Sequence, residues 1–129
     1  MPELAPASPP VLLCPGDQLA DGGKAHVFDL LEWQRPVRAF VLRFDGQVHG
    51  YINRCAHVPV ELDWQPGRVF DETGRWVMCA VHGAVYDPTS GTCVAGPCVH
   101  KRLKPITVRE EAGMVYWYPS AELAAAPAS

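Results

Sequence analysis

Two short segments of the sequence combine a cysteine with a histidine at spacings that suit a metal centre. The first holds Cys55 and His57 as Cys-x-His, the second holds Cys79 and His82 as Cys-x-x-His, and 21 residues separate them. Each segment pairs a soft thiolate with an imidazole across a tight turn. Two such loops can supply all the protein ligands of one [2Fe–2S] cluster, with Cys55 and Cys79 on one iron and His57 and His82 on the other.

The same four residues also suit a different metal. Tetrahedral Cys₂His₂ coordination is common in structural Zn²⁺ sites. Zinc fingers, however, usually place cysteine with cysteine and histidine with histidine, whereas the two residue types are interleaved here. The spacing therefore favours an iron-sulfur cluster over zinc, and a chance grouping of buried cysteines and histidines is the third interpretation.

The elements that must position these residues are predicted to be strands. β-Branched and aromatic runs alternate with Gly-containing turns at short intervals, which is typical of an antiparallel all-β domain. Asp45-Gly46, between two alternating runs, predicts a hairpin. Thirteen prolines oppose long helices, so we expect at most one short helix, near residues 29–34 or 121–126. The candidate strands are residues 11–13, 25–31, 37–44, 47–54, 75–81, 104–110 and 114–119.

The chain is expected to form one domain over residues 11–119, between flexible tails at 1–10 and 120–129. Residues 53–100 contain four of the five cysteines and few uninterrupted strand runs. This region indicates a small cluster-binding subdomain inserted into a β scaffold. Its segment between the two ligand pairs predicts a hairpin that turns at residues 71–74.

Composition excludes several classes of partner. The formal net charge is -3, and no long run of Lys or Arg occurs, which argues against nucleic acid or an anionic membrane. No apolar stretch approaches the roughly 20 residues that span a bilayer, and residues 1–10 lack the features of an export signal. A soluble cytoplasmic protein is the expectation.

Five cysteines are an odd number for a disulfide framework, so the thiols are expected to stay reduced or to bind metal. Cys93 and Cys98 flank Gly96-Pro97, which turns the chain and brings the two within range of a disulfide. In a reducing compartment we expect two thiols there instead. Cys14 is expected to be a small buried hydrophobic residue.

The sequence after His82 carries a further motif, HGAVYDPTSGTCVAGP. With the ligand pairs, it resembles the second cluster loop and the Gly-Pro loop of the Rieske family. The resemblance covers residues 53–98 at the level of motif and 11–118 at the level of strand pattern. It implies antiparallel sheets (an incomplete barrel or sandwich) with a cluster-binding subdomain, and histidines that bind iron through Nδ1. The residues that carry the motif are Gly83, Tyr86, Asp87, Gly91, Gly96 and Pro97.

The chain also departs from part of the family. Respiratory and photosynthetic Rieske proteins carry an extra cysteine in each loop, joined as a disulfide, and a serine after the glycine that follows the second histidine. This sequence has Val60, Val81 and Ala84 at those positions. Fewer hydrogen bonds to the sulfurs predict a potential in the lower part of the Rieske range. Tyr86 matches a tyrosine that can bond a ligand sulfur, and simple packing under the loop is the alternative.

The resemblance implies a ferredoxin-like one-electron carrier between a reductase and a terminal oxygenase or other redox enzyme. No mononuclear-iron triad of two histidines and a carboxylate can be assigned outside the cluster ligands, so the chain is not expected to be an enzyme by itself. The alternatives are a small Rieske-like subunit of a larger redox enzyme, such as an assimilatory nitrite reductase, and a zinc-stabilised binding module. We expect a monomer or a weak homo-oligomer.

Overall fold

The computed structural model of the chain describes residues 9–56, 60–63, 65–80, 83–98 and 100–126. Within these residues, ten strands form two antiparallel sheets, and the helical structure is a single 3-10 turn at Gly16–Gln18. The predicted all-β class is therefore confirmed. No helix in the described part of the chain has the length and apolar character needed to cross a bilayer.

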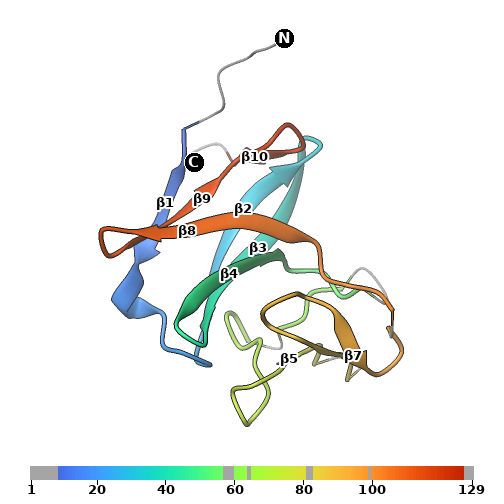
Figure 1. Cartoon of the computed structure of the whole chain (residues 1–129). Coiled ribbons are helices and arrows are strands. Elements are labelled where there is room, and N and C mark those ends of the chain that lie inside the picture. Colours follow the sequence, from blue (N-terminus) through green and yellow to red (C-terminus); the bar gives the residue numbers. More distant parts are fainter. Residues whose placement is uncertain (1–8, 57–59, 64, 81–82, 99, 127–129) are drawn as a thin grey trace.

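The larger sheet has seven strands and curls into the scaffold at the top of Figure 1. Its strands meet their neighbours in antiparallel register throughout. In spatial order they are β1 (Val11–Pro15), β9 (Met114–Tyr118), β8 (Pro105–Glu111), β4 (Gln47–Ile52), β3 (Arg35–Phe44), β2 (His26–Glu32) and β10 (Leu123–Ala125).

The smaller sheet lies below the scaffold in Figure 1 and forms the predicted subdomain. It consists of β5 (Val77–Met78), β6 (Val85–Tyr86) and β7 (Cys93–Ala95). The hairpin predicted at residues 71–74 precedes β5. It is closed by the antiparallel bridge between Phe70 and Val77 and by the Asp71 N–H, which donates to the Trp76 carbonyl at 2.8 Å.

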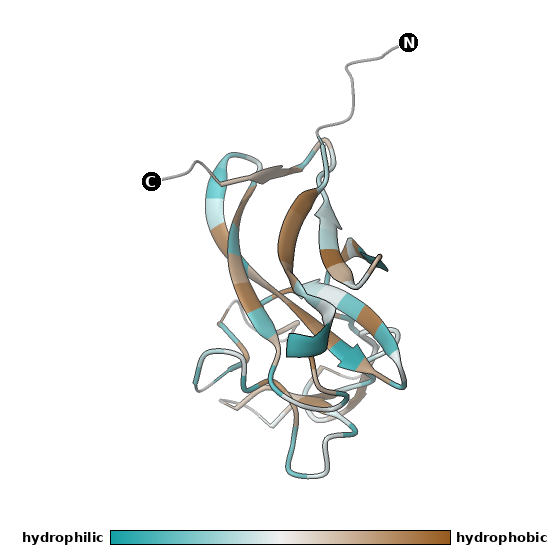
Figure 2. Ribbon diagram, turned by 90° about the vertical axis from the view of Figure 1, so that its left-hand side faces the viewer, coloured by the Kyte–Doolittle hydropathy of each residue, from teal (hydrophilic) through white to brown (hydrophobic). Residues whose placement is uncertain are grey.

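Strand β3 connects the scaffold to the subdomain, because one of its faces packs in a scaffold core and the other packs in the core that contains the two cysteines. Figure 2 shows hydrophobic and hydrophilic residues alternating along parts of the larger sheet, as half-buried strands require. In β3, by contrast, the four consecutive residues 39–42 are fully buried. Phe40 and Leu42 pack in the core that contains Cys55 and Cys79, whereas Ala39 packs with Trp117 in a scaffold core.

Three hairpins have tight turns in which both central residues have positive φ, the geometry that matches strand twist. Asp45-Gly46 confirms the predicted β3–β4 hairpin, with φ of 52° and 79°. Ala112-Gly113 joins β8 to β9 in the same way. The β2–β3 turn was not predicted, because its central residues are Trp33 and Gln34, with φ of 49° and 66°. These types rarely adopt the left-handed region, and nothing in their sequence signals a turn.

Neither of the two positions at which a short helix was allowed is helical. Residues 29–32 belong to β2. Leu123–Ala125 form β10, although residues 120–129 were predicted to be a flexible tail. Strand β10 pairs with β2, with Leu123 opposite Glu32. Leu123 is only 5% exposed and joins a scaffold core. Burial of this leucine and pairing with an open sheet edge outweigh the helix propensity of the alanine-rich segment.

A half-buried ionic network closes the edge of the scaffold beside the first cysteine loop. Glu32 accepts two hydrogen bonds from the Arg54 guanidinium, at 2.8 and 3.2 Å, and also pairs with Lys104. Lys104 in turn contacts Glu122 at 2.6 Å. The hydrogen bonds from Arg54 and Lys104 lower the pKa of Glu32 from 4.5 to about 2. The carboxylate charge therefore stabilises the folded state.

We predict that Glu32→Gln lowers the free energy of unfolding by about 1–2 kcal/mol at neutral pH, because it leaves two cations without their shared partner. Because folding depresses the pKa, the stabilisation exists above the unfolded value and disappears as the pH falls from about 5 towards 2. Urea unfolding of wild type and variant should therefore converge in acid. Asp29→Asn, at an exposed position on the same strand, serves as the control; a difference that persists in acid contradicts the prediction.

Candidate metal centre

Two of the four predicted ligands, Cys55 and Cys79, lie in one buried core beside the smaller sheet. Cys55 is 3% exposed and Cys79 is fully buried. His57 and His82, the other two predicted ligands, lie outside the described residues. The structure thus brings the two cysteines into one apolar environment, and the complete four-residue set stays a prediction.

The loop that carries Cys55 is held by its own backbone and by a buried asparagine. The Cys55 N–H donates to the Val60 carbonyl at 2.8 Å, which closes the loop around the Cys-x-His segment. Asn53 is 4% exposed, and its side-chain oxygen accepts the Leu62 N–H at 2.8 Å. Its amide nitrogen donates to Asp63 at 2.8 Å. Asn53 therefore fixes both the entrance of the loop and its return.

The loop that carries Cys79 is a tight turn bonded to the first loop. The Cys79 N–H donates to the Ala84 carbonyl at 2.8 Å, and the Gly83 N–H donates back to the Cys79 carbonyl at 2.9 Å. Gly83 has φ of 69°, a conformation that glycine adopts without strain. The Ala80 N–H donates to the Leu62 carbonyl at 3.0 Å. The two cysteine loops are therefore directly connected through their backbones.

Tyr86 on β6 joins the smaller sheet to the first cysteine. Its hydroxyl lies 3.3 Å from Cys55 Sγ and accepts the Ala56 N–H at 2.9 Å. Because the hydroxyl oxygen already accepts one hydrogen bond, its own hydrogen is free to point towards the sulfur. Burial, followed by the bond to Cys55, raises the pKa of Tyr86, so the group remains a donor. The structure therefore places the Tyr86 hydroxyl within hydrogen-bond distance of the Cys55 sulfur, and the role of that sulfur as a cluster ligand stays a prediction.

Cys93 and Cys98 form a disulfide, with a Cα–Cα distance of 5.8 Å. The expectation of two thiols at these positions is therefore wrong. The turn at Gly96-Pro97 reverses the chain, as the sequence indicated, and brings the two buried sulfurs together. Cys14 is buried in a separate scaffold core, as expected.

The loop between the two cysteines of the disulfide lies against the second ligand loop. Gly96 has φ of 95°, and a Cβ placed on it would lie 2.9 Å from Ala84 Cα and 3.2 Å from the Gly83 carbonyl oxygen. Real Cβ atoms essentially never come within 3.0 Å of another non-bonded heavy atom, and the contact of 3.2 Å is also unusually tight. Glycine is therefore required at residue 96 for conformation and for space, and the Gly-Pro segment packs backbone to backbone on the turn after Cys79.

Tyr51 on β4 anchors the other end of the subdomain to the scaffold. Its hydroxyl donates to the Pro88 carbonyl at 2.9 Å, and burial raises its pKa to about 12. A Cβ on Gly91 would lie 2.7 Å from the Tyr51 ring, so this glycine provides the space for the tyrosine. Neither Tyr51 nor Asn53 was predicted from the sequence to support the site. A polar side chain directly before a ligand loop was the available signal for Asn53.

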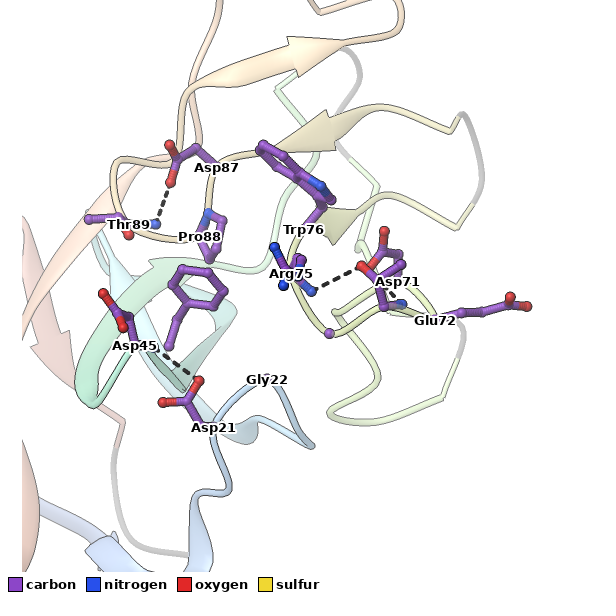
Figure 3. A pocket seen from close by; sticks show the side chains of 13 residues that line it. Asp21, Gly22, Asp45, Asp71, Glu72, Arg75, Trp76, Asp87, Pro88 and Thr89 are labelled. Carbon is purple, nitrogen blue, oxygen red and sulfur yellow. Dashed lines mark hydrogen bonds between the residues drawn. The ribbon is translucent and has the colours of Figure 1, made fainter.

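An open groove of about 810 Å³ separates the 71–76 hairpin from the scaffold (Figure 3). It is lined by five carboxylates and one guanidinium, and neither Cys55 nor Cys79 contributes to it. Several of these carboxylates are occupied in holding turns. Asp21 accepts the N–H groups of Asp45 and Gly46, at 3.0 and 2.6 Å, and Asp87 accepts the Thr89 N–H at 2.8 Å. The groove is therefore a structural junction between the hairpin and the scaffold.

Comparisons with known proteins agree with this geometry. The family model described as the Rieske [2Fe-2S] domain matches residues 10–122. The ferredoxin of carbazole 1,9a-dioxygenase from Nocardioides aromaticivorans IC177 has 24% identity and a TM-score of 0.67, over 88% of this chain and 100% of its own. The Sphingomonas yanoikuyae B1 ferredoxin has 23% identity and a TM-score of 0.65, over 87% of this chain and 100% of its own.

A further solved structure is the complex of reduced oxygenase and oxidized ferredoxin in carbazole 1,9a-dioxygenase. It has 19% identity and a TM-score of 0.65, over 84% of this chain and 92% of the matched chain. A search of curated proteins finds no match. At these identities the solved structures establish a shared fold, which agrees with the antiparallel sheets and small subdomain that the resemblance implied.

The close approach at residue 96 predicts that Gly96→Ala is more damaging than the same change at another left-handed glycine. Gly46 has φ of 79° but no atom within 4 Å of its Cβ position. Gly46→Ala should lower the free energy of unfolding by about 1 kcal/mol through backbone strain alone. Gly96→Ala should cost a further ~1–3 kcal/mol, because the second ligand loop must move. Equal losses in chemical denaturation contradict the close contact.

Proposed function

The chain belongs to the Rieske [2Fe–2S] domain family, and on this basis we propose that it is a one-electron carrier. The observation that carries the proposal is the Tyr86 hydroxyl at 3.3 Å from Cys55 Sγ, in the same buried core as Cys79. This places a hydrogen-bond donor on the sulfur of a predicted ligand within a chain that matches the family over residues 10–122. We propose no catalytic activity for the chain by itself.

The proposed ligands of the cluster are Cys55, His57, Cys79 and His82. Two cysteines buried in one apolar core fit an iron-sulfur cluster, because thiolates are the usual ligands of these clusters and the core excludes water. The bonded loops supply one cysteine each, as a shared cluster requires. When bound, the cluster supplies a one-electron couple. Family membership favours it over the zinc alternative.

The residues around the two cysteines have a clear task in this function. The backbone bonds from Cys55 to Val60 and from Cys79 to Ala84 hold the main chain that carries both sulfurs and would limit its movement during electron transfer. A centre that moves little has a small reorganisation cost. Tyr86 donates a hydrogen bond to one sulfur, which stabilises the added negative charge of the reduced state.

The same surroundings support a potential in the lower part of the Rieske range. Val60 offers no thiol to bridge the two loops, and Ala84, directly after Gly83, is a fully buried methyl group without a hydroxyl donor. Tyr86 is one side-chain donor to a sulfur among the described residues. Fewer donors leave the reduced cluster less stabilised.

A terminal oxygenase is the proposed electron acceptor, with a reductase as the donor. The support is a structure of similar fold in which a reduced oxygenase is paired with an oxidized ferredoxin. A carrier that exchanges partners should be a monomer or a weak homo-oligomer in the cytoplasm. Size-exclusion chromatography with a candidate oxygenase separates a transient carrier from a permanent enzyme subunit, since the latter elutes as a stable complex.

Purified protein should contain about two iron and two acid-labile sulfide atoms per chain, and its reduced EPR spectrum should show the low average g value of Rieske centres. A flavin reductase should reduce it, and an oxygenase should reoxidise it.

Cys79→Ser should abolish iron binding, whereas Cys14→Ser, at a cysteine in a separate core, should retain it. His57→Cys should keep a cluster at a lower potential. Colourless protein with one zinc per chain refutes the proposal.

Tyr86→Phe tests the hydrogen bond to Cys55. Removing the hydroxyl should lower the cluster potential by about 20–60 mV, which corresponds to ~0.5–1.5 kcal/mol for one electron. Protein-film voltammetry measures the shift. Tyr51→Phe is the matched control, because its hydroxyl bonds to the Pro88 carbonyl and to no cysteine. If both variants have the wild-type potential, Tyr86 serves only as packing.

A further inference from the structure

The Cys93–Cys98 disulfide lies inside the core that also contains Cys55 and Cys79. Cys98 is fully buried, and Cys93 is 4% exposed. The residues between them, 94–97, are all exposed. A buried disulfide therefore closes a solvent-exposed loop beside the two predicted cysteine ligands.

The disulfide reaches the first ligand loop through Tyr86. Cys93 on β7 is paired with Tyr86 on β6. The Tyr86 hydroxyl in turn contacts Cys55 Sγ and the Ala56 N–H. A displacement of Cys93 is thus transmitted to the hydrogen bonds of Cys55 through one intervening side chain.

The second ligand loop is reached through Gly96. This residue lies within the disulfide loop, and its backbone packs on Gly83 and Ala84. Ala84 accepts the Cys79 N–H, and Gly83 donates to the Cys79 carbonyl. One six-residue loop, from Cys93 to Cys98, therefore supports both predicted cysteine ligands.

We propose that Cys93 and Cys98 form a thiol-responsive site that controls how firmly the chain retains its cluster. The closed disulfide holds the Gly96-Pro97 segment against both ligand loops. When a dithiol reductant opens it, the segment loosens and the cluster becomes labile. This inference rests on the proposed cluster for its consequence, but the existence of the disulfide is independent of iron.

The exchange reaction balances with a dithiol as the only co-reactant. One thiolate of the reductant attacks a sulfur of the disulfide, and its second thiol resolves the mixed disulfide. The Cys93–Cys98 S–S bond breaks, an S–S bond forms in the reductant, and two electrons and two protons pass to the protein. Cys93 is the more exposed residue of the pair, so its sulfur is the expected point of attack.

The reaction can reverse because backbone hydrogen bonds keep the two cysteines close. The Cys93 N–H donates to the Lys101 carbonyl, and the Lys101 N–H donates to the Cys98 carbonyl, both at 2.8 Å. Both bonds involve main-chain atoms and survive the opening of the disulfide. The thiols therefore remain near each other and can form the bond again with an oxidant.

The first test counts thiols in the whole protein. Protein purified without reductant is unfolded in an alkylating agent with an iron chelator and analysed by mass spectrometry. Three of the five cysteines should be alkylated, and peptide mapping should place the unmodified pair at Cys93 and Cys98. After treatment with dithiothreitol all five should react. Five alkylated cysteines without reductant overturn the proposal, whatever the iron content.

The second test measures cluster loss in the presence of a chelator, from the decay of visible absorption. The variant Cys93→Ala with Cys98→Ala should lose its cluster about tenfold faster than wild type, because the loop then opens more often. Dithiothreitol should accelerate loss in wild type but not in this variant, which separates disulfide opening from reduction of the cluster itself. Cys14→Ala, in a separate scaffold core, should behave as wild type.

The outcomes of these tests distinguish the two proposals. Three alkylated cysteines in a protein without iron refute the proposed function and leave the disulfide in place. An iron-loaded protein whose double variant keeps its cluster at the wild-type rate refutes the thiol-responsive site and leaves the proposed function intact. If the double variant does not fold, the acceleration by dithiothreitol in wild type, and its reversal after reoxidation, decides the question.

Discussion

The hydrogen bonds of the Tyr86 hydroxyl are the interaction on which the proposed metal centre depends. This one group contacts Cys55 Sγ and accepts the Ala56 N–H, so it fixes a sulfur and the backbone beside it at the same time. Its ring belongs to a strand of the smaller sheet, which also carries the pairing with Cys93. The position of the first predicted ligand is therefore set by a different part of the chain, and the subdomain must fold as a unit to build it.

The scaffold acts on this centre through a few anchored contacts. Tyr51 bonds to the Pro88 carbonyl, and Asn53 closes the return of the first loop. Both side chains come from the end of β4 and the residues that follow it. The loops themselves are short and contain little regular structure, so their order derives from hydrogen bonds and burial instead of from sheet pairing.

Much of this arrangement could be predicted from the sequence, because its signals are local. Asp45-Gly46 marked a hairpin, the strand pattern indicated an all-β fold, and the spacing of Cys55 and Cys79 indicated one shared centre. Features that depend on distant contacts were missed. The Trp33-Gln34 turn has no turn residues, and Leu123 forms a strand only because β2 offers an open edge. The Cys93–Cys98 pair was misjudged, because compartment statistics describe an average protein, whereas the turn at Gly96-Pro97 sets the distance here.

The two buried faces of β3 also bear on how this chain can change over evolutionary time. Phe40 and Leu42 belong to the core of the metal centre, whereas Ala39 belongs to a scaffold core. Side chains that share no neighbours usually contribute independently to stability. Substitutions can therefore accumulate in the scaffold core with little effect on the packing around Cys55 and Cys79. A strand divided in this way lets the scaffold diverge in sequence while the packing around the two predicted ligands is kept.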